Sequence, residues 1–131
     1  MYQIEKKPWG LKLTFADFIQ KNEMEKWVQE AEQTLKDQKG SFGVLVDMRT
    51  LKPLPKDAQE KMEEGQRMFK EKGMSRSAVV LSSALTTMQF KRIAHETGIS
   101  QWERYIDASA TSDWEGASVA WIQGGVDPEK K

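Results

Sequence analysis

The fold of this chain is decided by the stretch Phe42-Gly-Val-Leu-Val-Asp-Met-Arg-Thr-Leu-Lys-Pro-Leu-Pro55. It opens with an apolar run from Gly43 to Val46, turns polar at Asp47, and is broken by Pro53 and Pro55. An apolar run this short, followed by turn residues, is typical of a strand that is buried on both faces of a sheet. We therefore expect a central strand here, with a loop at its carboxyl end that leads into a helix.

On the C-terminal side of this stretch, helical and extended patterns alternate. Small and apolar residues recur at helical spacing from Lys56 to Lys72, which predicts a helix ended by Gly73. A glycine in the middle of this helix, Gly65, costs about 1 kcal/mol relative to alanine, so we expect its backbone to pack closely onto the sheet. Next come a buried strand at Ser77–Leu81 and a helix from about Ala84 to Thr97, closed by Gly98. A short strand follows at Arg104–Asp107. The last helix is predicted to begin with a capping box at Ser112 and Glu115 and to end at Gln123, with Gly124 as its stop.

On the N-terminal side, the pattern begins with a hairpin. Tyr2 to Lys7 and Leu11 to Phe15 each alternate apolar with polar residues on either side of a Pro8-Trp9-Gly10 turn, so we predict two antiparallel strands. No helix-capping residue follows the second strand before Asn22. The second strand is therefore predicted to extend as far as Ile19. The first helix is predicted from a capping box at Asn22 and Glu25 to a stop at Gly40, with its core stripe at Met24, Trp27, Val28, Ala31 and Leu35.

The complete order of elements is β-β-α-β-α-β-α-β-α. After the initial hairpin, strands and helices alternate, which predicts an α/β fold with parallel strands joined by right-handed crossovers. The chain of 131 residues fits one domain. We place that domain at residues 1–124 and expect residues 125–131 to form a polar C-terminal tail that frays.

The composition excludes several classes of function. The chain has no cysteine, which rules out thiol nucleophiles and thiolate metal sites, and its single histidine rules out a multi-histidine metal site. Twenty basic residues balance twenty acidic ones and are interspersed with them, which argues against a nucleic-acid surface. No apolar run approaches the roughly 20 residues of a membrane span, and the N-terminus lacks the apolar core of a signal peptide. We therefore expect a cytoplasmic location.

Two parts of the chain are distinctive beyond their periodicity. They are Gly43-Val-Leu-Val-Asp-Met-Arg-Thr-Leu51, continuing through Pro55, and Ser77-Ala-Val-Val-Leu81, followed by Thr86-Thr-Met-Gln-Phe-Lys-Arg-Ile-Ala94. In this order of elements, the chain resembles the SpoIIAA-like branch of the STAS-domain superfamily over nearly its whole length. The resemblance implies a mixed sheet of four or five strands flanked by helices, in a small bacterial protein without an assigned activity. Relatives by fold include anti-sigma factor antagonists, which bind partner proteins, and CRAL-TRIO lipid carriers.

The antagonists carry a switch serine where a helix begins after the central strand. The matching positions here are Pro55-Lys56-Asp57-Ala58, none of which bears a hydroxyl. Thr50 is the nearest hydroxyl, but it lies well before the predicted helix. Phosphorylation would act at this place by adding charge to a helix N-terminus. We therefore predict no phosphorylation site: either the switch is absent, or Asp57 holds the position in one charge state.

Polar side chains cluster in three loops that the α/β order brings to the carboxyl edge of the sheet. Open α/β sheets usually bind ligands at this edge, and helix N-termini there supply backbone amides suited to an anion. The alternative, which we favour, is that the hydroxyls cap helices and shape turns. Asp47 and Asp107 also suggest paired catalytic carboxylates, although an ion pair of Asp47 with Arg49 or a cap on the local turn is favoured. The candidate ligand residues are Asp47, Arg49, Thr50, Ser82, Thr86, Thr87 and Asp107.

Two of the predicted helices offer candidate interfaces. In the helix from Ala84 to Thr97, one face is assigned to the core, whereas Met88, Arg92 and His95 lie together on the other, near Leu85. This outward face is either a contact surface or simply solvated. The last helix is apolar around more than one face, so it is either covered on both sides or meets a partner. The candidate interface residues are Met88, Arg92, His95, Trp114 and Trp121, and a homodimer is the expected association. The core face comprises Thr86, Phe90, Ile93, Ala94 and Thr97.

These observations favour a non-enzymatic binding or regulatory module that contacts a second copy of itself or a partner protein, without a cofactor or metal. The alternative is a carrier or sensor of a small apolar or lipid-like ligand, held between the sheet and its helices. An enzyme ranks third because no nucleophile motif is present.

Overall fold

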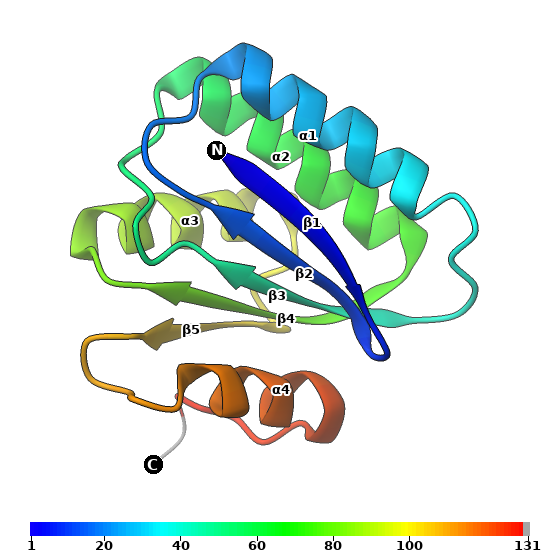
Figure 1. Cartoon of the computed structure of the whole chain (residues 1–131), viewed down its shortest axis with the longest axis vertical. Helices are drawn as coiled ribbons and strands as arrows, with labels where there is room; N and C mark the ends of the chain where they lie inside the picture. Colours follow the sequence, from blue (N-terminus) through cyan, green and yellow to red (C-terminus); the bar gives the residue numbers. More distant parts are fainter. Residues whose placement is uncertain (130–131) are drawn as a thin grey trace.

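A five-stranded mixed sheet runs through the molecule, with its strands in sequence order, β1-β2-β3-β4-β5 (Figure 1). The structure is a computed structural model, and it describes residues 1–129. The first two strands form an antiparallel hairpin, and every later neighbour in the sheet is parallel. The strands are β1 (Tyr2–Lys7), β2 (Gly10–Phe15), β3 (Phe42–Asp47), β4 (Met74–Leu81) and β5 (Glu103–Asp107).

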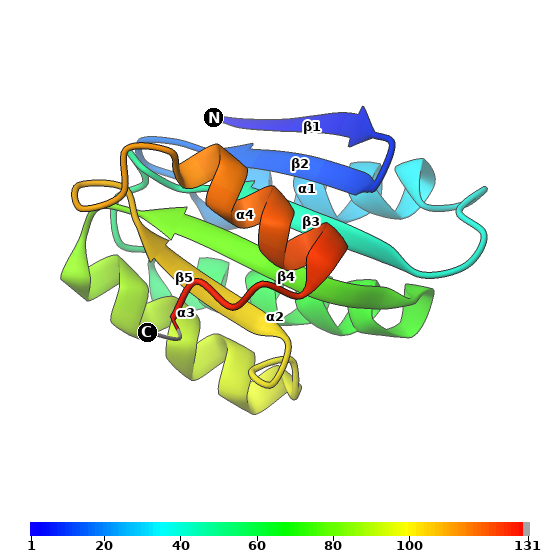
Figure 2. The ribbon, with the colours of Figure 1, turned by 90° about the horizontal axis from the view of Figure 1, so that it is seen from below.

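Helices cover both faces of this sheet, but unequally. Right-handed crossovers between strands in sequence order place every connecting helix on the same face. Accordingly, α1, α2 and α3 lie on one side, here called the front face, whereas α4 lies alone on the back face (Figures 1 and 2). The predicted α/β class, a mixed sheet flanked by helices, is therefore confirmed. The helices are α1 (Lys21–Thr34), α2 (Lys56–Lys72), α3 (Ala84–Thr97) and α4 (Trp114–Gly124).

The predicted central strand is β3, and all of its residues are buried. Because successive side chains of a strand point to opposite faces, β3 contributes to two separate cores. Val44 and Val46 belong to the larger core under α1, α2 and α3. Leu45 belongs to the smaller core under α4, together with Ala78 and Val80 of β4. The run from Gly43 to Val46 is almost wholly apolar because the strand is covered from both sides.

The start of the first helix differs from the prediction. Strand β2 ends at Phe15 and does not continue to Ile19. Asp17 has a positive φ of 61°, and its N–H donates to the carbonyl of Thr50, 3.1 Å away. This contact turns the chain away from the sheet, and α1 begins at Lys21 without a side-chain cap. The capping box predicted at Asn22 is therefore wrong. Gly40 is not the stop of α1 either, because that helix ends at Thr34.

Helices α2 and α3 have the predicted bounds, and both end at a left-handed glycine, Gly73 and Gly98. The cap of α4 was predicted wrongly. The carboxylate of Asp113, not the hydroxyl of Ser112, accepts a hydrogen bond from the N–H of Gly116, and the left-handed residue at the end is Gly125.

The C-terminal tail makes contacts with the sheet over its described part. Asp127 forms an ion pair with Arg104 of β5 at 3.0 Å. The carboxylate of Glu129 accepts a hydrogen bond from the N–H of Tyr105 at 3.1 Å. Residues 125–129 therefore fold back beside β5, and the prediction for residues 130 and 131 lies outside the described part of the chain.

Gly65 packs against a helix, where the sequence predicted packing onto the sheet. A Cβ atom built on Gly65 would lie 2.2 Å from the Cζ3 atom of Trp27, a ring carbon. Trp27 belongs to α1, is 2% exposed, and packs edge-on against Phe15 with ring centroids 5.1 Å apart. The glycine is thus the place where α2 accommodates the largest buried side chain of α1.

Replacing Gly65 with alanine is expected to destabilise the protein, although alanine favours a helix by about 1 kcal/mol. The added methyl group has no space beside Trp27, and overpacking of this kind costs about 1–3 kcal/mol. Urea unfolding followed by tryptophan fluorescence measures the change in the free energy of unfolding. The matched control is Gly124→Ala, where the new Cβ atom would meet only Val126 at 3.7 Å. A Gly65→Ala variant as stable as Gly124→Ala would contradict this packing.

Candidate functional site

Within residues 1–129, neighbouring strands send the chain to opposite faces at one place on the carboxyl edge of the sheet. After β3 and β4 the chain turns to the front face, into α2 and α3, whereas after β5 it turns to the back face, into α4 (Figures 1 and 2). Divergence of this kind opens a crevice between the two strands. The three polar loops predicted at this edge therefore do not form one site.

A hollow lies at this point of divergence, between the carboxyl ends of β4 and β5. Three of the predicted ligand residues line it: Ser82, Thr87 and Asp107. Lys91 of α3 and Tyr105 of β5 complete its polar wall, with the Lys91 ammonium group 5.4 Å from the centre of the Tyr105 ring. We call this feature the β4–β5 hollow.

Several polar groups in the β4–β5 hollow already serve local structure. The hydroxyl oxygen of Ser83 accepts from the N–H of Thr86 at 3.3 Å, and the Thr87 hydroxyl donates to the carbonyl of Ser83 at 2.7 Å. Asp107 accepts from both the N–H and the hydroxyl of Ser109, which lowers the pKa of Asp107 below its ordinary value. A carboxylate thus stands opposite the N-terminus of α3. The hollow suits a small polar molecule of mixed charge better than a simple anion, because a phosphate would be repelled by Asp107.

The other predicted ligand residues lie elsewhere. Thr86 is fully buried, and its hydroxyl lies 3.5 Å from the carbonyl of Leu51. Thr50 is exposed. Asp47 and Asp107 cannot act as paired carboxylates, because their strand positions face opposite sides of the sheet: Asp47 aligns with Val80 of the back core, and Asp107 aligns with Leu81 of the front core.

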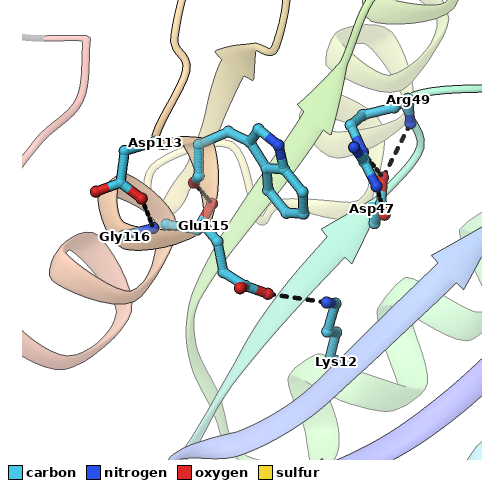
Figure 3. Close-up of polar contacts among 8 residues, drawn as sticks. Lys12, Asp47, Arg49, Asp113, Glu115 and Gly116 are labelled. Carbon is cyan, nitrogen blue, oxygen red and sulfur yellow. Dashed lines mark hydrogen bonds and ion pairs between the residues drawn. The ribbon is translucent and has the colours of Figure 1, made fainter.

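Asp47 and Arg49 form a cluster with α4 on the back face (Figure 3). The Arg49 guanidinium donates to both carboxylate oxygens of Asp47, at 2.9 and 3.0 Å, and its central carbon lies 4.3 Å from the centre of the Trp114 ring. Lys12 of β2 forms an ion pair with Glu115 at 2.9 Å, which lowers the pKa of Glu115. These contacts join the start of α4 to β2 and β3. The pairing of Asp47 with Arg49 is as predicted, and it serves to hold this helix.

Trp121 is part of the back core and is not open to a partner. Its side chain is 7% exposed, and its indole N–H points to the carbonyls of Ser77 and Trp102, at 3.0 and 3.1 Å. The guanidinium of Arg104 lies 4.3 Å from the centre of its ring. Trp114 is half-buried under Arg49. The apolar residues around α4 are therefore covered by the chain's own sheet and arginines, and they give no support to a homodimer through this helix.

The outward face of α3 is exposed as predicted. Leu85 is 57% exposed and Met88 is 67% exposed, and both stand beside the exposed side chains of Arg92 and His95. These four residues are here called the α3 patch. The residues assigned to the opposite face, Thr86, Phe90, Ile93, Ala94 and Thr97, are all buried.

Sequence reasoning missed one buried carboxyl group. Glu103, at the start of β5, is 4% exposed and accepts hydrogen bonds from the hydroxyls of Ser77, at 2.9 Å, and Tyr105, at 2.5 Å. Burial raises the pKa of Glu103 to about 7, against the opposing effect of these two hydrogen bonds. Burial also raises the pKa of Tyr105. Glu103 borders an apolar internal cavity of about 30 Å³ between the sheet and the helices of the front face.

Within residues 1–129, no cluster of three or more histidine, aspartate or glutamate side chains is placed to hold a metal ion. None of the helices in that range is both long enough and apolar enough to cross a membrane.

The buried Glu103 makes a testable prediction about pH. Its pKa is about 7 in the folded chain and 4.5 ordinarily, so between these values the folded state binds more protons than the unfolded state. The contribution of Glu103 to the free energy of unfolding is therefore largest below about pH 4.5, and it is lost as the pH rises to 7. The loss is on the order of 3 kcal/mol, because one pKa unit corresponds to about 1.4 kcal/mol.

Urea unfolding at a series of pH values from 4.5 to 7.5 measures this loss. The Glu103→Gln variant keeps the shape of the side chain without its charge and is expected to lack the decline. Glu60→Gln, at an exposed position of α2, controls for the removal of one carboxylate. Parallel profiles for the wild type and Glu103→Gln would show that Glu103 does not titrate in this range.

No protein-family model matches the chain, and no curated protein and no solved structure matches it either.

Proposed function

We propose that the protein is a non-enzymatic binding module that contacts a partner protein through the α3 patch. The observation that carries this proposal is the exposure of Leu85 and Met88 on the outer face of a helix whose inner face is fully packed. Two large apolar side chains beside two basic ones resemble a protein contact surface more than a ligand pocket.

The spacing of the α3 patch indicates the kind of partner. Its members are separated by three, four and three residues, which is the spacing of the seam between two packed helices. The first turn offers Leu85 and Met88, and the later turns offer Arg92 and His95. A partner helix with apolar residues at one end and acidic residues at the other would match this pattern. Arg92 is held in place by Glu96, at 2.9 Å, and by Gln59 of α2.

The helix that carries the patch is fixed to the rest of the chain by its inner face and by a side-chain hydrogen-bond pair. Phe90, Ile93 and Ala94 anchor it to the front core. The side-chain amide of Gln89 accepts from the N–H of Leu54 at 2.9 Å and donates to its carbonyl at 3.3 Å. A preformed surface loses little conformational entropy on binding, which favours a contact made by this helix over one made by a loop.

The second candidate function is carriage of a small apolar ligand in the front core. In its favour, the internal cavity is lined largely by apolar side chains, and the indole N–H of Trp27 is buried without a hydrogen-bond partner among the described residues. However, a cavity of about 30 Å³ has room for only one or two water molecules. An acyl chain would require α1 or α2 to move away from the sheet. We therefore rank the carrier second.

The proposal is tested by capture experiments with the immobilised chain in a lysate of the source cells, with retained proteins quantified by mass spectrometry. Met88→Asp places a charge in the apolar part of the α3 patch, and burying an unpaired charge is costly. We expect it to reduce specific capture by about tenfold or more, equivalent to about 1.4 kcal/mol. Gln29→Asp introduces the same side chain on the exposed face of α1 and is expected to capture as the wild type does. Equal capture by both variants would reject the α3 patch as the contact surface.

A further inference from the structure

The two edge strands of the sheet differ in whether their outward backbone groups are bound. At β5, the N–H of Tyr105 points away from the sheet and donates to the carboxylate of Glu129, so it is not available to a further strand. At the other margin lies β1, and Figure 2 shows nothing beside its outer edge. No described residue outside β2 forms a hydrogen bond with the backbone of Tyr2, Ile4 or Lys6.

The pairing of β1 with β2 determines which backbone groups point outward. Met1 and Ala16 exchange both of their hydrogen bonds, with the Met1 amino group 3.1 Å and the Ala16 N–H 2.9 Å from their acceptors. In an antiparallel pair, such bonded pairs alternate with pairs that exchange none. Gln3 and Glu5 therefore bond to β2, and the N–H and C=O groups of Tyr2, Ile4 and Lys6 point to the open edge.

We propose that two copies of the chain pair through β1, antiparallel, about a two-fold axis at Ile4. This register places Ile4 opposite Ile4 of the second copy and Tyr2 opposite Lys6 in both directions. It is the one antiparallel register in which all three outward-pointing residues of each copy form backbone hydrogen bonds. With two hydrogen bonds in each of the three residue pairs, the two copies are joined by about six. A shift of two residues in either direction loses a pair.

The side chains are complementary in the same register. On the front face, the two Ile4 side chains meet, and each Tyr2 ring faces a Lys6 ammonium group, a favourable cation–π arrangement. On the back face, Gln3 lies opposite Glu5 of the second copy. The register shifted toward the end of β1 would instead place Glu5 opposite Glu5, and like charges directly opposite are destabilising. The charged end of β1 thus selects one pairing and disfavours indiscriminate strand addition.

The proposed dimer is compatible with the α3 patch. That patch lies over the β4 and β5 side of the sheet, and the two-fold axis lies beside β1, at the opposite margin (Figure 1). Because the two-fold axis is perpendicular to the sheet, a dimer would present its two α3 patches on the same side of the continuous sheet, toward its two outer ends, which permits bivalent binding. Pairing by one strand buries little surface, so the affinity is expected to be on the order of micromolar.

Disulfide cross-linking tests the register directly, because the natural chain has no cysteine. Gln3 and Glu5 are exposed, and in the proposed register they are directly opposite each other in a pair without mutual hydrogen bonds. The Cα atoms of such a pair are about 4.5 Å apart, within the range for a disulfide. Two residues at the same position, Gln3 and Gln3 of the second copy, would be roughly 8 Å apart, which is too far.

The experiment compares Gln3→Cys alone, Glu5→Cys alone and an equal mixture of the two, under mild oxidation at concentrations from about one to several hundred micromolar, since the expected affinity is micromolar. We expect a covalent dimer that forms mainly in the mixture, with at least a several-fold excess over either variant alone. A dimer formed mainly by Glu5→Cys alone, or mainly by Gln3→Cys alone, would indicate a shifted register and overturn the proposal. So would the absence of a cross-link in all three samples together with a monomeric mass of the wild type in light scattering at the highest concentration.

Discussion

The structure depends on the burial of β3 from both sides. A strand whose alternate side chains enter two cores exposes one of them to water unless both faces of the sheet are covered. The three crossover helices all lie on the front face, so the back face has to be covered by the last helix. The return of α4 over β3, β4 and β5 is thus a consequence of the apolar run Gly43–Val46 and of the matching run in β4.

Helix α4 is held over the back core by arginine side chains as well as by apolar contact. Arg49 lies over Trp114, and Arg104 lies over Trp121. Each arginine is in turn bound by a carboxylate, Asp47 in one case and Asp127 in the other. The polar residues that follow β3 are therefore occupied in attaching α4. The outer face of α3 and the outer edge of β1 take no part in this attachment, and both proposals for binding arise from these two places.

Much of the fold could be predicted from the sequence, because long periodic patterns report directly on burial. The bounds of α2 and α3 and the exposed face of α3 follow from such patterns. Capping was predicted less well: Asn22 and Ser112 have the right residue type, but the loop geometry gives α1 no side-chain cap and gives α4 the cap Asp113. Gly65 was correctly expected at a close contact, but periodicity does not reveal which element supplies the neighbour.

The candidate site was harder to predict, since it depends on which face each strand residue points to. Asp47 and Asp107 both follow apolar strands, and only the pairing register places them on opposite faces. Glu103 was missed because a single charged residue at the start of a short strand gives no sign of burial. Its environment is built by Ser77 and Tyr105, and the contact with Ser77 spans 26 residues of sequence.

We propose that the protein works through its surface, with a closed core. Native mass spectrometry of freshly purified protein tests this claim most directly, because a ligand held in the front core would remain bound to the folded chain. The predicted result is the mass of the chain and of its dimer, without an adduct. A bound molecule of the size of a lipid, released when the chain unfolds, would contradict the claim and make carriage the function.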